Sequence, residues 1–205
     1  MNRRELLGAA GAVAAAGAVP ALAAGAVAAA AGEAPTLPRS KETNQFDFSK
    51  IKPQVVRAGG TIVEATGENF PVLKDQNASA FLLVLKPGGA REPHWHPNSW
   101  ELDVPLSGRG RLGVANPDST YSVQDISPGQ IGFIPQGYAH YIENTGTDDL
   151  RWIVVFNNTY PDDIGLSTTF GGMPTHMFTE TLSLPTGALD NANKPDRNLY
   201  IVEGN

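Results

Sequence analysis

The fold of this chain is decided by the stretch Gly88-Gly89-Ala90-Arg91-Glu92-Pro93-His94-Trp95-His96-Pro97-Asn98-Ser99-Trp100-Glu101, which holds two of the four histidines. In a β-strand, residues i and i+2 point to the same face, so His94 and His96 present two imidazoles together while Trp95 points away. Glu101 follows across a short loop, where it is placed to begin the next strand. The stretch therefore predicts two imidazoles and a carboxylate on adjoining strands.

A third imidazole lies in Pro135-Gln136-Gly137-Tyr138-Ala139-His140. Three neutral imidazoles and one carboxylate suit a divalent first-row metal and leave open positions if the ion is octahedral. A lone histidine is more often a surface or core residue, but the joint spacing favours a metal site. The chain has no cysteine, which excludes thiolate ligands, disulfides and a cysteine nucleophile. The predicted metal ligands are His94, His96, Glu101 and His140.

Short apolar runs separated by turn residues surround these clusters. Turns such as Lys86-Pro87-Gly88-Gly89 and Ser127-Pro128-Gly129 are typical of tight connections between strands. Many short strands at this spacing predict an all-β sandwich or barrel. The expected strands are Thr61–Ala65, Ala80–Leu85, Glu101–Leu106, Arg111–Val114, Tyr121–Ile126, Ile131–Ile134, Tyr138–Ile142 and Leu150–Phe156.

Two details of this pattern are specific enough to test. Tyr121 and Val123 alternate with polar neighbours, which predicts a strand with one apolar face buried. After Phe156 the alternation ends, and we expect short helices at Ile164–Phe170 and Thr175–Leu184, packed outside the barrel.

Composition limits the classes of partner. The chain has 205 residues, 41% of them hydrophobic and 18% charged, which is enough for one globular domain with a sizeable core. The net charge of −6 and the pI near 5.1 disfavour binding to nucleic acid or to an anionic membrane surface. An anionic substrate must therefore be attracted by local charges.

The first residues read as an export signal. Arg3 and Arg4 precede an Ala/Gly/Val run that carries no charge after Glu5, and this resembles a twin-arginine export signal. A membrane anchor and a plain low-complexity helix are the alternatives. We expect a leader over 1–31, a linker over 32–45, one domain over 46–184 and a tail over 185–205. Export predicts a periplasmic or secreted protein and no membrane contact once the leader is removed.

The spacing of the two clusters also resembles a known family. The cupin motifs G-x5-H-x-H-x4-E-x6-G and G-x5-P-x-G-x2-H-x3-N match at every position. The matching residues are Gly88, His94, His96, Glu101, Gly108, Gly129, Pro135, Gly137, His140 and Asn144. The resemblance implies a single cupin, a double-stranded β-helix or jelly-roll barrel, with short C-terminal helices.

Within the cupins, 46–184 looks like one half of a bacterial bicupin oxalate decarboxylase. That resemblance implies Mn²⁺, although iron, nickel and zinc suit the same ligands. It implies that Arg91, three residues before the first histidine, binds the substrate carboxylate, unless it is an exposed arginine beside Glu92. It also implies that Asp163 stands where the family has a lid glutamate acting as acid. The alternative for Asp163 is a solvated surface carboxylate.

The resemblance leaves three functions open. The first is decarboxylation of oxalate to formate and CO₂. The second is oxidation of oxalate with O₂ to CO₂ and H₂O₂, as in the germin-like oxalate oxidases, which are also monocupins. The third is a non-catalytic protein that binds a metal or a small acid, because one fold hosts many functions. The relatives further imply a homo-oligomer held by the helices after the barrel.

Overall fold

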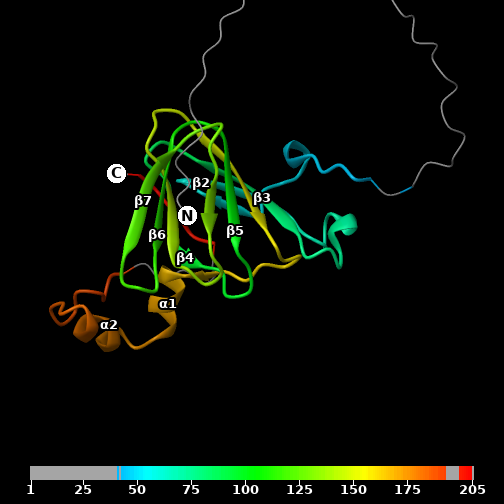
Figure 1. Cartoon of the computed structure of the whole chain (residues 1–205). Coiled ribbons are helices and arrows are strands. Elements are labelled where there is room, and N and C mark those ends of the chain that lie inside the picture. The colour runs from blue at the N-terminus through cyan, green and yellow to red at the C-terminus, as the bar shows by residue number, and fades with distance from the viewer. Residues whose placement is uncertain (1–40, 42, 193–198, 205) are drawn as a thin grey trace, which may run out of the picture. The chain divides into compact units, whose positions relative to one another are not determined.

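The computed structural model describes residues 41, 43–192 and 199–204. The predicted leader and most of the predicted linker lie outside these residues. The described part of the chain forms two β-sheets and a few short helices (Figure 1). None of its helices has the length and apolar character needed to cross a membrane. The all-β fold with short C-terminal helices that we predicted is confirmed.

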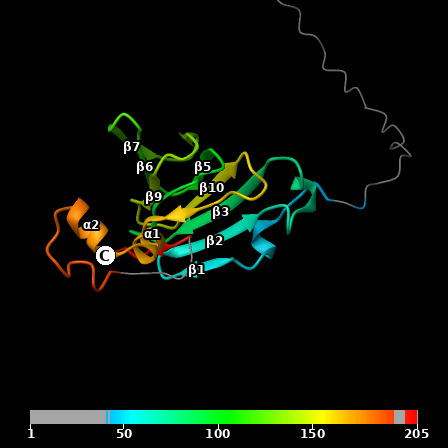
Figure 2. The ribbon, with the colours of Figure 1, turned by 90° about the horizontal axis from the view of Figure 1, so that it is seen from below.

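The first sheet has six strands in the order β1-β2-β3-β10-β5-β8. All pairs along this order are antiparallel, and the strands β1, β2, β3, β10 and β5 lie in that sequence in Figure 2. The strands are β1 (Val55–Arg57), β2 (Gly60–Ala65), β3 (Ser79–Leu85), β10 (Leu150–Phe156), β5 (Glu101–Ser107) and β8 (Gly132–Ile134).

The second sheet runs β11-β4-β9-β6-β7 and is also antiparallel. A further short strand, β12, pairs with β4. The strands are β4 (Ala90–Trp95), β6 (Gly110–Ala115), β7 (Tyr121–Ile126), β9 (His140–Asn144), β11 (Ile164–Gly165) and β12 (Ile201–Val202). Two residues of the stretch expected to form a tail therefore belong to a sheet.

The helices are all short. Two 3-10 helices, η1 (Phe48–Lys50) and η2 (Pro71–Leu73), precede β1 and β3. The α-helices α1 (Leu166–Gly172) and α2 (Thr175–Thr181) come between β11 and β12 in the chain and lie below the barrel in Figure 1. The first of the two expected helices begins later than predicted, because Ile164 and Gly165 pair with Trp95 and His94 as β11.

The apolar core fills the space between the sheets. Burial of large apolar side chains is the dominant favourable contribution to folding. The fully buried residues of this core include Trp152, Leu85, Ile134, Ile142 and Leu150. The core holds the strands that carry the histidines in place, so the site is built on rigid elements rather than on free loops.

Strand β7 corrects one prediction. Its alternation is real but reversed, since Tyr121 is 78% exposed and Val123 is 47% exposed. The polar side chains of Ser122 and Gln124 instead line a hollow between the sheets. The strand is the last of its sheet, so among the described residues no further strand pairs with its outer edge.

A β-bulge in β4 decides which of its side chains reach the barrel interior. Arg91 pairs with Ile142 and His94 with His140, so three steps along β4 match two along β9. Without the bulge, residues 91 and 94 would point to opposite faces because side chains alternate. Pro93, which has no N–H for the ladder, lies within the irregular stretch. The bulge brings the guanidinium of Arg91 and the imidazole of His94 to the same cavity.

Candidate metal centre

The structure brings the four predicted ligands together. His94, His96, Glu101 and His140 offer ligand atoms that all lie within 4.8 Å of one another, and all four residues are buried. His94 comes from β4, His96 from the residue after it, Glu101 from the start of β5 and His140 from the start of β9. The Nε2 atoms of His96 and His140 lie 2.9 and 3.0 Å from Glu101 Oε2.

Backbone carbonyls fix the tautomer of each imidazole. The Nδ1 atom of His94 lies 2.7 Å from the carbonyl of Glu92, and that of His140 lies 2.9 Å from the carbonyl of Tyr138. For His96 the partner is the carbonyl of Asp162, at 2.7 Å. A carbonyl oxygen can only accept, so each Nδ1 must carry the proton. In the neutral rings, Nε2 then presents a lone pair to the cluster, as metal ligands require.

This arrangement calls for a positive charge at its centre. Three lone pairs and a carboxylate oxygen converge with no proton between them when the imidazoles are neutral. His96 Nε2 and Glu101 Oε1 are buried and have no hydrogen-bond partner among the described residues. Leaving such atoms unpaired is unfavourable in a low-dielectric interior. A divalent cation bound by the three Nε2 atoms and the carboxylate satisfies all of them.

The pKa shifts show the same demand for charge. Burial, reinforced by the nearby Arg91, holds the pKa of His94 well below its usual range, which keeps this ring neutral and able to bind a metal. For His96, burial acts to lower the pKa, but the Glu101 carboxylate outweighs it and raises the pKa. Burial likewise acts to raise the pKa of Glu101, yet His140 and His96 hold it well below its usual value.

Arg91 and Asp163 lie directly beside this cluster. Both side chains are buried, and Arg91 Nη2 donates a short hydrogen bond to Asp163 Oδ2. The same carboxylate oxygen lies 3.9 Å from His94 Nε2 and 4.0 Å from His96 Nδ1. Of the two alternatives for Asp163, the structure therefore contradicts a solvated surface carboxylate, and Arg91 is not an exposed arginine.

The segment that carries Asp163, residues 157–163, is held beside the site by hydrogen bonds to Asn98. The Asn98 side chain accepts a hydrogen bond from the Asp162 N–H (2.8 Å) and donates to the Asp162 carboxylate (2.8 Å). It also donates to the carbonyl of Tyr160 at 3.2 Å. Because the Asp162 carbonyl orients His96, the segment links this metal ligand to Asn98.

The cavity at the cluster is small, and these residues line it. Its volume is about 30 Å³, which is room for about two water molecules by the usual minimum of 10–15 Å³ each. Polar side chains line one side and apolar barrel residues such as Phe81, Val154 and Phe156 line the other, together with Leu199. A dicarboxylate that pairs with Arg91 must displace Asp163 from it.

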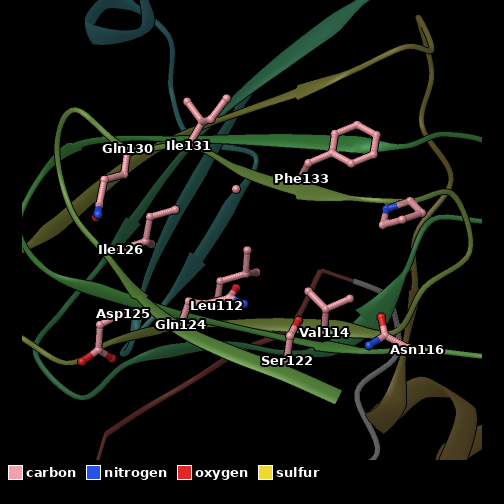
Figure 3. A pocket seen from close by; sticks show the side chains of 12 residues that line it. Leu112, Val114, Asn116, Ser122, Gln124, Asp125, Ile126, Gln130, Ile131 and Phe133 are labelled. Carbon is pink, nitrogen blue, oxygen red and sulfur yellow. The ribbon is translucent and has the colours of Figure 1, made fainter. Parts of the chain in front are cut away.

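A larger hollow lies elsewhere. It measures about 520 Å³ and opens between the last strands of the two sheets, β7 and β8. Figure 3 shows Gln124, Ile126 and Leu112 on one side of it and Ile131 and Phe133 on the other. No histidine or arginine lines it, and its single carboxylate is paired with Arg111 at 3.1 Å. The chemically equipped cavity is therefore the smaller one.

Several residues around the site escaped sequence reasoning. Asp103 is fully buried two residues after Glu101 and accepts a hydrogen bond from Trp152 Nε1 at 2.5 Å. Burial, and then the charge of Glu101, raises the pKa of Asp103 well above its usual range. Glu92 accepts hydrogen bonds from the N–H and hydroxyl of Ser167 at 2.8 and 2.9 Å, which ties α1 to β4. The i, i+2 spacing from Glu101 was the available signal for Asp103.

Two sheets enclosing three histidines, a glutamate and a paired arginine define a metal-binding β-barrel protein. The cupin family model matches residues 46–185, and the chain belongs to the cupin family. This confirms the family that the two motifs indicated.

Comparisons with individual proteins narrow the subfamily. The chain is 28% identical over 138 residues to an oxalate decarboxylase of Bacillus subtilis, covering 67% of this chain and 35% of the relative. It is 25% identical over 170 residues to oxalate oxidase 2 of Hordeum vulgare, covering 76% and 75%. A solved structure concerned with the Mn(II) centres of the Bacillus subtilis decarboxylase superposes with a TM-score of 0.70 at 26% identity, covering 77% of this chain and 41% of that chain. The chain thus spans about a third of the length of the decarboxylase relative.

Proposed function

We propose that this protein is a metal-dependent cupin enzyme that acts on a small carboxylic acid, with decarboxylation of oxalate to formate and CO₂ as its reaction. The observation that carries the proposal is the placement of Arg91 and Asp163. Their side chains lie together at the histidine cluster, in a small cavity. A cation-binding cluster beside a buried guanidinium suits a small dianion, whose two ends need two positive partners.

Arg91 supplies the partner for one carboxylate. Its guanidinium is held by the carbonyl of Tyr200 at 3.1 Å and lies 3.7 Å from the Glu92 carboxylate, so its orientation is fixed before substrate arrives. In this structure Asp163 occupies the face of Arg91 that points to the cluster. A substrate carboxylate that binds there replaces one carboxylate by another, and Arg91 remains paired throughout.

Asp163 is the proposed acid. The C–C bond of the oxalate dianion breaks, CO₂ leaves, and the remaining carbon takes one proton to become formate, so the reaction consumes one proton and is redox-neutral overall. Displaced from Arg91 by the substrate, the Asp163 carboxyl group remains next to the histidine cluster and, when it carries a proton, delivers that proton to the carbon as a general acid.

The residues present fit Mn²⁺ as the bound metal. Hard oxygen and imidazole donors are ligands that Mn²⁺ accepts, and His94, His96, Glu101 and His140 would hold it. The ion supplies positive charge for the second carboxylate and positions for substrate and dioxygen. Iron, nickel and zinc suit the same donors, so the metal is identified by elemental analysis.

Oxalate oxidation is the second candidate, because the chain is also similar to an oxalate oxidase, that of Hordeum vulgare, at 25% identity. In that reaction oxalate, O₂ and two protons give two CO₂ and H₂O₂, and no proton is delivered to carbon. Arg91 keeps its role, and Asp163 is not needed as an acid.

The experiment is metal analysis of the purified protein followed by oxalate turnover, with formate and peroxide quantified separately. Formate supports the decarboxylase, and peroxide supports the oxidase. Saturable oxalate binding without either product supports the non-catalytic binding protein.

Two variants test the assigned roles. We expect Arg91→Lys to raise the oxalate KM about 10-fold or more, because a charge-assisted hydrogen bond contributes about 1.5–3 kcal/mol. We expect Asp163→Ala to lower formate production about 100-fold or more, the usual contribution of a general acid. The control is Asp149→Ala, which removes an exposed ion pair with Lys86. Undiminished formate from Asp163→Ala contradicts the acid role.

We also propose export of this protein through its twin-arginine sequence to the periplasm or the exterior. The support is the sequence pattern over 1–31 described above. The double variant Arg3→Lys, Arg4→Lys should retain the protein in the cytoplasm, and normal secretion of that variant removes the proposal.

The homo-oligomer expected from the resemblance stays a prediction. Apolar side chains on and after α2, among them Met177 (53% exposed) and Leu182 (55% exposed), are available for such a contact. Light scattering of the wild type and of Met177→Glu tests it, since a charge in the contact should lower the measured mass.

A further inference from the structure

The last described residues of the chain, 199–204, form what we call the C-terminal segment, and this segment lies against the metal centre. Ile201 and Val202 pair with Arg91 and Ala90 of β4, the strand that carries His94. Ile201 is 2% exposed and belongs to the apolar core. The segment is therefore part of the barrel, although α1 and α2 separate it in sequence from the other strands.

The backbone of this segment contacts both proposed catalytic side chains. The Tyr200 carbonyl accepts hydrogen bonds from Arg91 Nη1 at 3.1 Å and from the Glu92 N–H at 3.3 Å. The Leu199 N–H donates to Asp163 Oδ1 at 3.4 Å. Two neighbouring residues thus supply an acceptor for the guanidinium and a donor for the carboxylate with which it pairs.

Glycines make room for this contact. A Cβ on Gly59 would lie 2.0 Å from the Val202 carbonyl oxygen, and a Cβ on Gly204 would lie 2.5 Å from the backbone of Gly88. Both distances are shorter than any real Cβ contact, so the backbones approach as closely as they do because these positions lack side chains. The barrel surface is shaped to receive the segment.

Leu199 itself adopts a conformation that needs an explanation. Its φ is +65°, in the left-handed region that residues other than glycine, asparagine and aspartate rarely occupy. Such backbone strain is held where surrounding contacts compensate for it, often at functional sites. Here the side chain lines the 30 Å³ cavity beside the histidines, and it packs against the apolar core.

We propose that Leu199 and Tyr200 are positioning residues of the active site, which hold Asp163 and Arg91 toward the metal centre, and that the Leu199 side chain limits the length of the acid that binds. The size limit rests on the proposed function, whereas the positioning does not. Malonate is the natural probe of length, because it is oxalate with one additional methylene group.

The first experiment titrates oxalate and malonate into the manganese-loaded protein by calorimetry. We expect the wild type to bind oxalate more tightly than malonate. In Leu199→Ala the ratio of malonate to oxalate affinity should rise about 10-fold, since one methylene in an apolar pocket changes binding by at least that factor. Val202→Ala is the matched control, because Val202 lies in the same C-terminal segment, is 37% exposed and does not line the cavity. An unchanged ratio in Leu199→Ala, with the segment still docked, overturns the size limit.

The second experiment needs no substrate. Hydrogen exchange of 199–204, followed by mass spectrometry, should be about 10-fold faster in Asp163→Ala than in wild type, because the Leu199 N–H loses a charged acceptor. Asp149→Ala should leave it unchanged. Equal exchange in Asp163→Ala and wild type overturns the positioning of Asp163 by this segment.

The two experiments separate the failures. If wild type binds neither acid, the proposed function and the size limit fail together, and the exchange result still decides the positioning. If Leu199→Ala releases the segment, as faster exchange of 199–204 would show, then both acids should bind more weakly because Arg91 and Asp163 lose their backbone partners. Unweakened binding with a released segment also overturns the proposal.

Discussion

Truncating Ile201 to alanine should loosen the C-terminal segment far more than the same truncation of Val202. Ile201 is 2% exposed and packs in the core between the sheets, whereas Val202 is 37% exposed. Removing a buried isoleucine side chain to alanine destabilises a protein by about 2–5 kcal/mol, which includes the cavity left behind. A partly exposed valine changed to alanine stays within about 0.5 kcal/mol. At about 2–4 °C per kcal/mol for a chain of this size, Ile201→Ala should lower Tm by about 6–12 °C for a loss near 3 kcal/mol.

Local release of the segment sets an upper limit on that loss. A two-residue strand paired with one neighbour can detach without unfolding the barrel. The loss of unfolding free energy then cannot exceed the free energy with which the segment docks, and the fall in Tm is limited accordingly. Differential scanning calorimetry and hydrogen exchange of 199–204 therefore have to be measured on the same samples. A small fall in Tm with fast exchange indicates local release, and a large fall indicates cooperative unfolding. The reasoning is refuted if Ile201→Ala matches Val202→Ala in both Tm and exchange.

Three further predictions concern the metal, the buried acid and the glycine contact. Mn²⁺ at about 100 times its Kd should stabilise the protein by about 2.7 kcal/mol. This corresponds to a Tm rise of about 5–11 °C, which a chelator should reverse. The same rise in His140→Ala would contradict the assignment of His140 as a metal ligand. Asp103→Asn should gain stability relative to wild type as pH rises above about 4. The pKa of Asp103 is raised in the folded state, so its protonated form contributes stability at low pH, and this contribution is lost as pH rises through the folded-state pKa. Urea unfolding of both proteins at about pH 5 and about pH 8 measures the change, and a stability difference that stays constant between the two would contradict the prediction. Gly59→Ala should speed exchange of 199–204, because its Cβ meets the Val202 carbonyl oxygen at 2.0 Å, while Gly172→Ala, where a Cβ meets nothing within 4 Å, should not; equal exchange in both would show that the close approach is not needed.

The spacing of the ligands made the cluster predictable, and the period of the strands made the sheets predictable. His94 and His96 are two residues apart on one strand, and that relation survives any detail of packing. The position of Glu101 at a strand start followed from the loop length before it. Strands Tyr121–Ile126 and Leu150–Phe156 have the predicted bounds, because turn residues mark both ends.

What was missed depends on contacts between distant segments. A strand of two residues, Ile201–Val202, is too short to show the alternation of a β-strand in the sequence. A glycine such as Gly59 is compatible with a close backbone approach, but the sequence does not indicate which segment approaches it. Tyr121 and Val123 show the limit of alternation, which tells that the two faces of a strand differ but not which face is covered. The bulge at β4 has the same character: Pro93 signals an irregular strand, yet the turn of Arg91 into the cavity appears in the pairing with β9.

The Arg91–Asp163 pair implies an order of events under the proposed function. Asp163 occupies the face of Arg91 that points to the cluster, in a space of about 30 Å³, so residues 157–163, and with them the C-terminal segment, must shift before oxalate pairs with Arg91. The two are linked, because Asp163 bonds to Leu199 and to Arg91 while Asp162 bonds to Asn98 and to His96. Substrate that takes the place of Asp163 on Arg91 exchanges one carboxylate for another and leaves the buried guanidinium paired. The same exchange frees the Asp163 carboxyl group from Arg91, so substrate binding itself makes this group available as the acid that the decarboxylation needs.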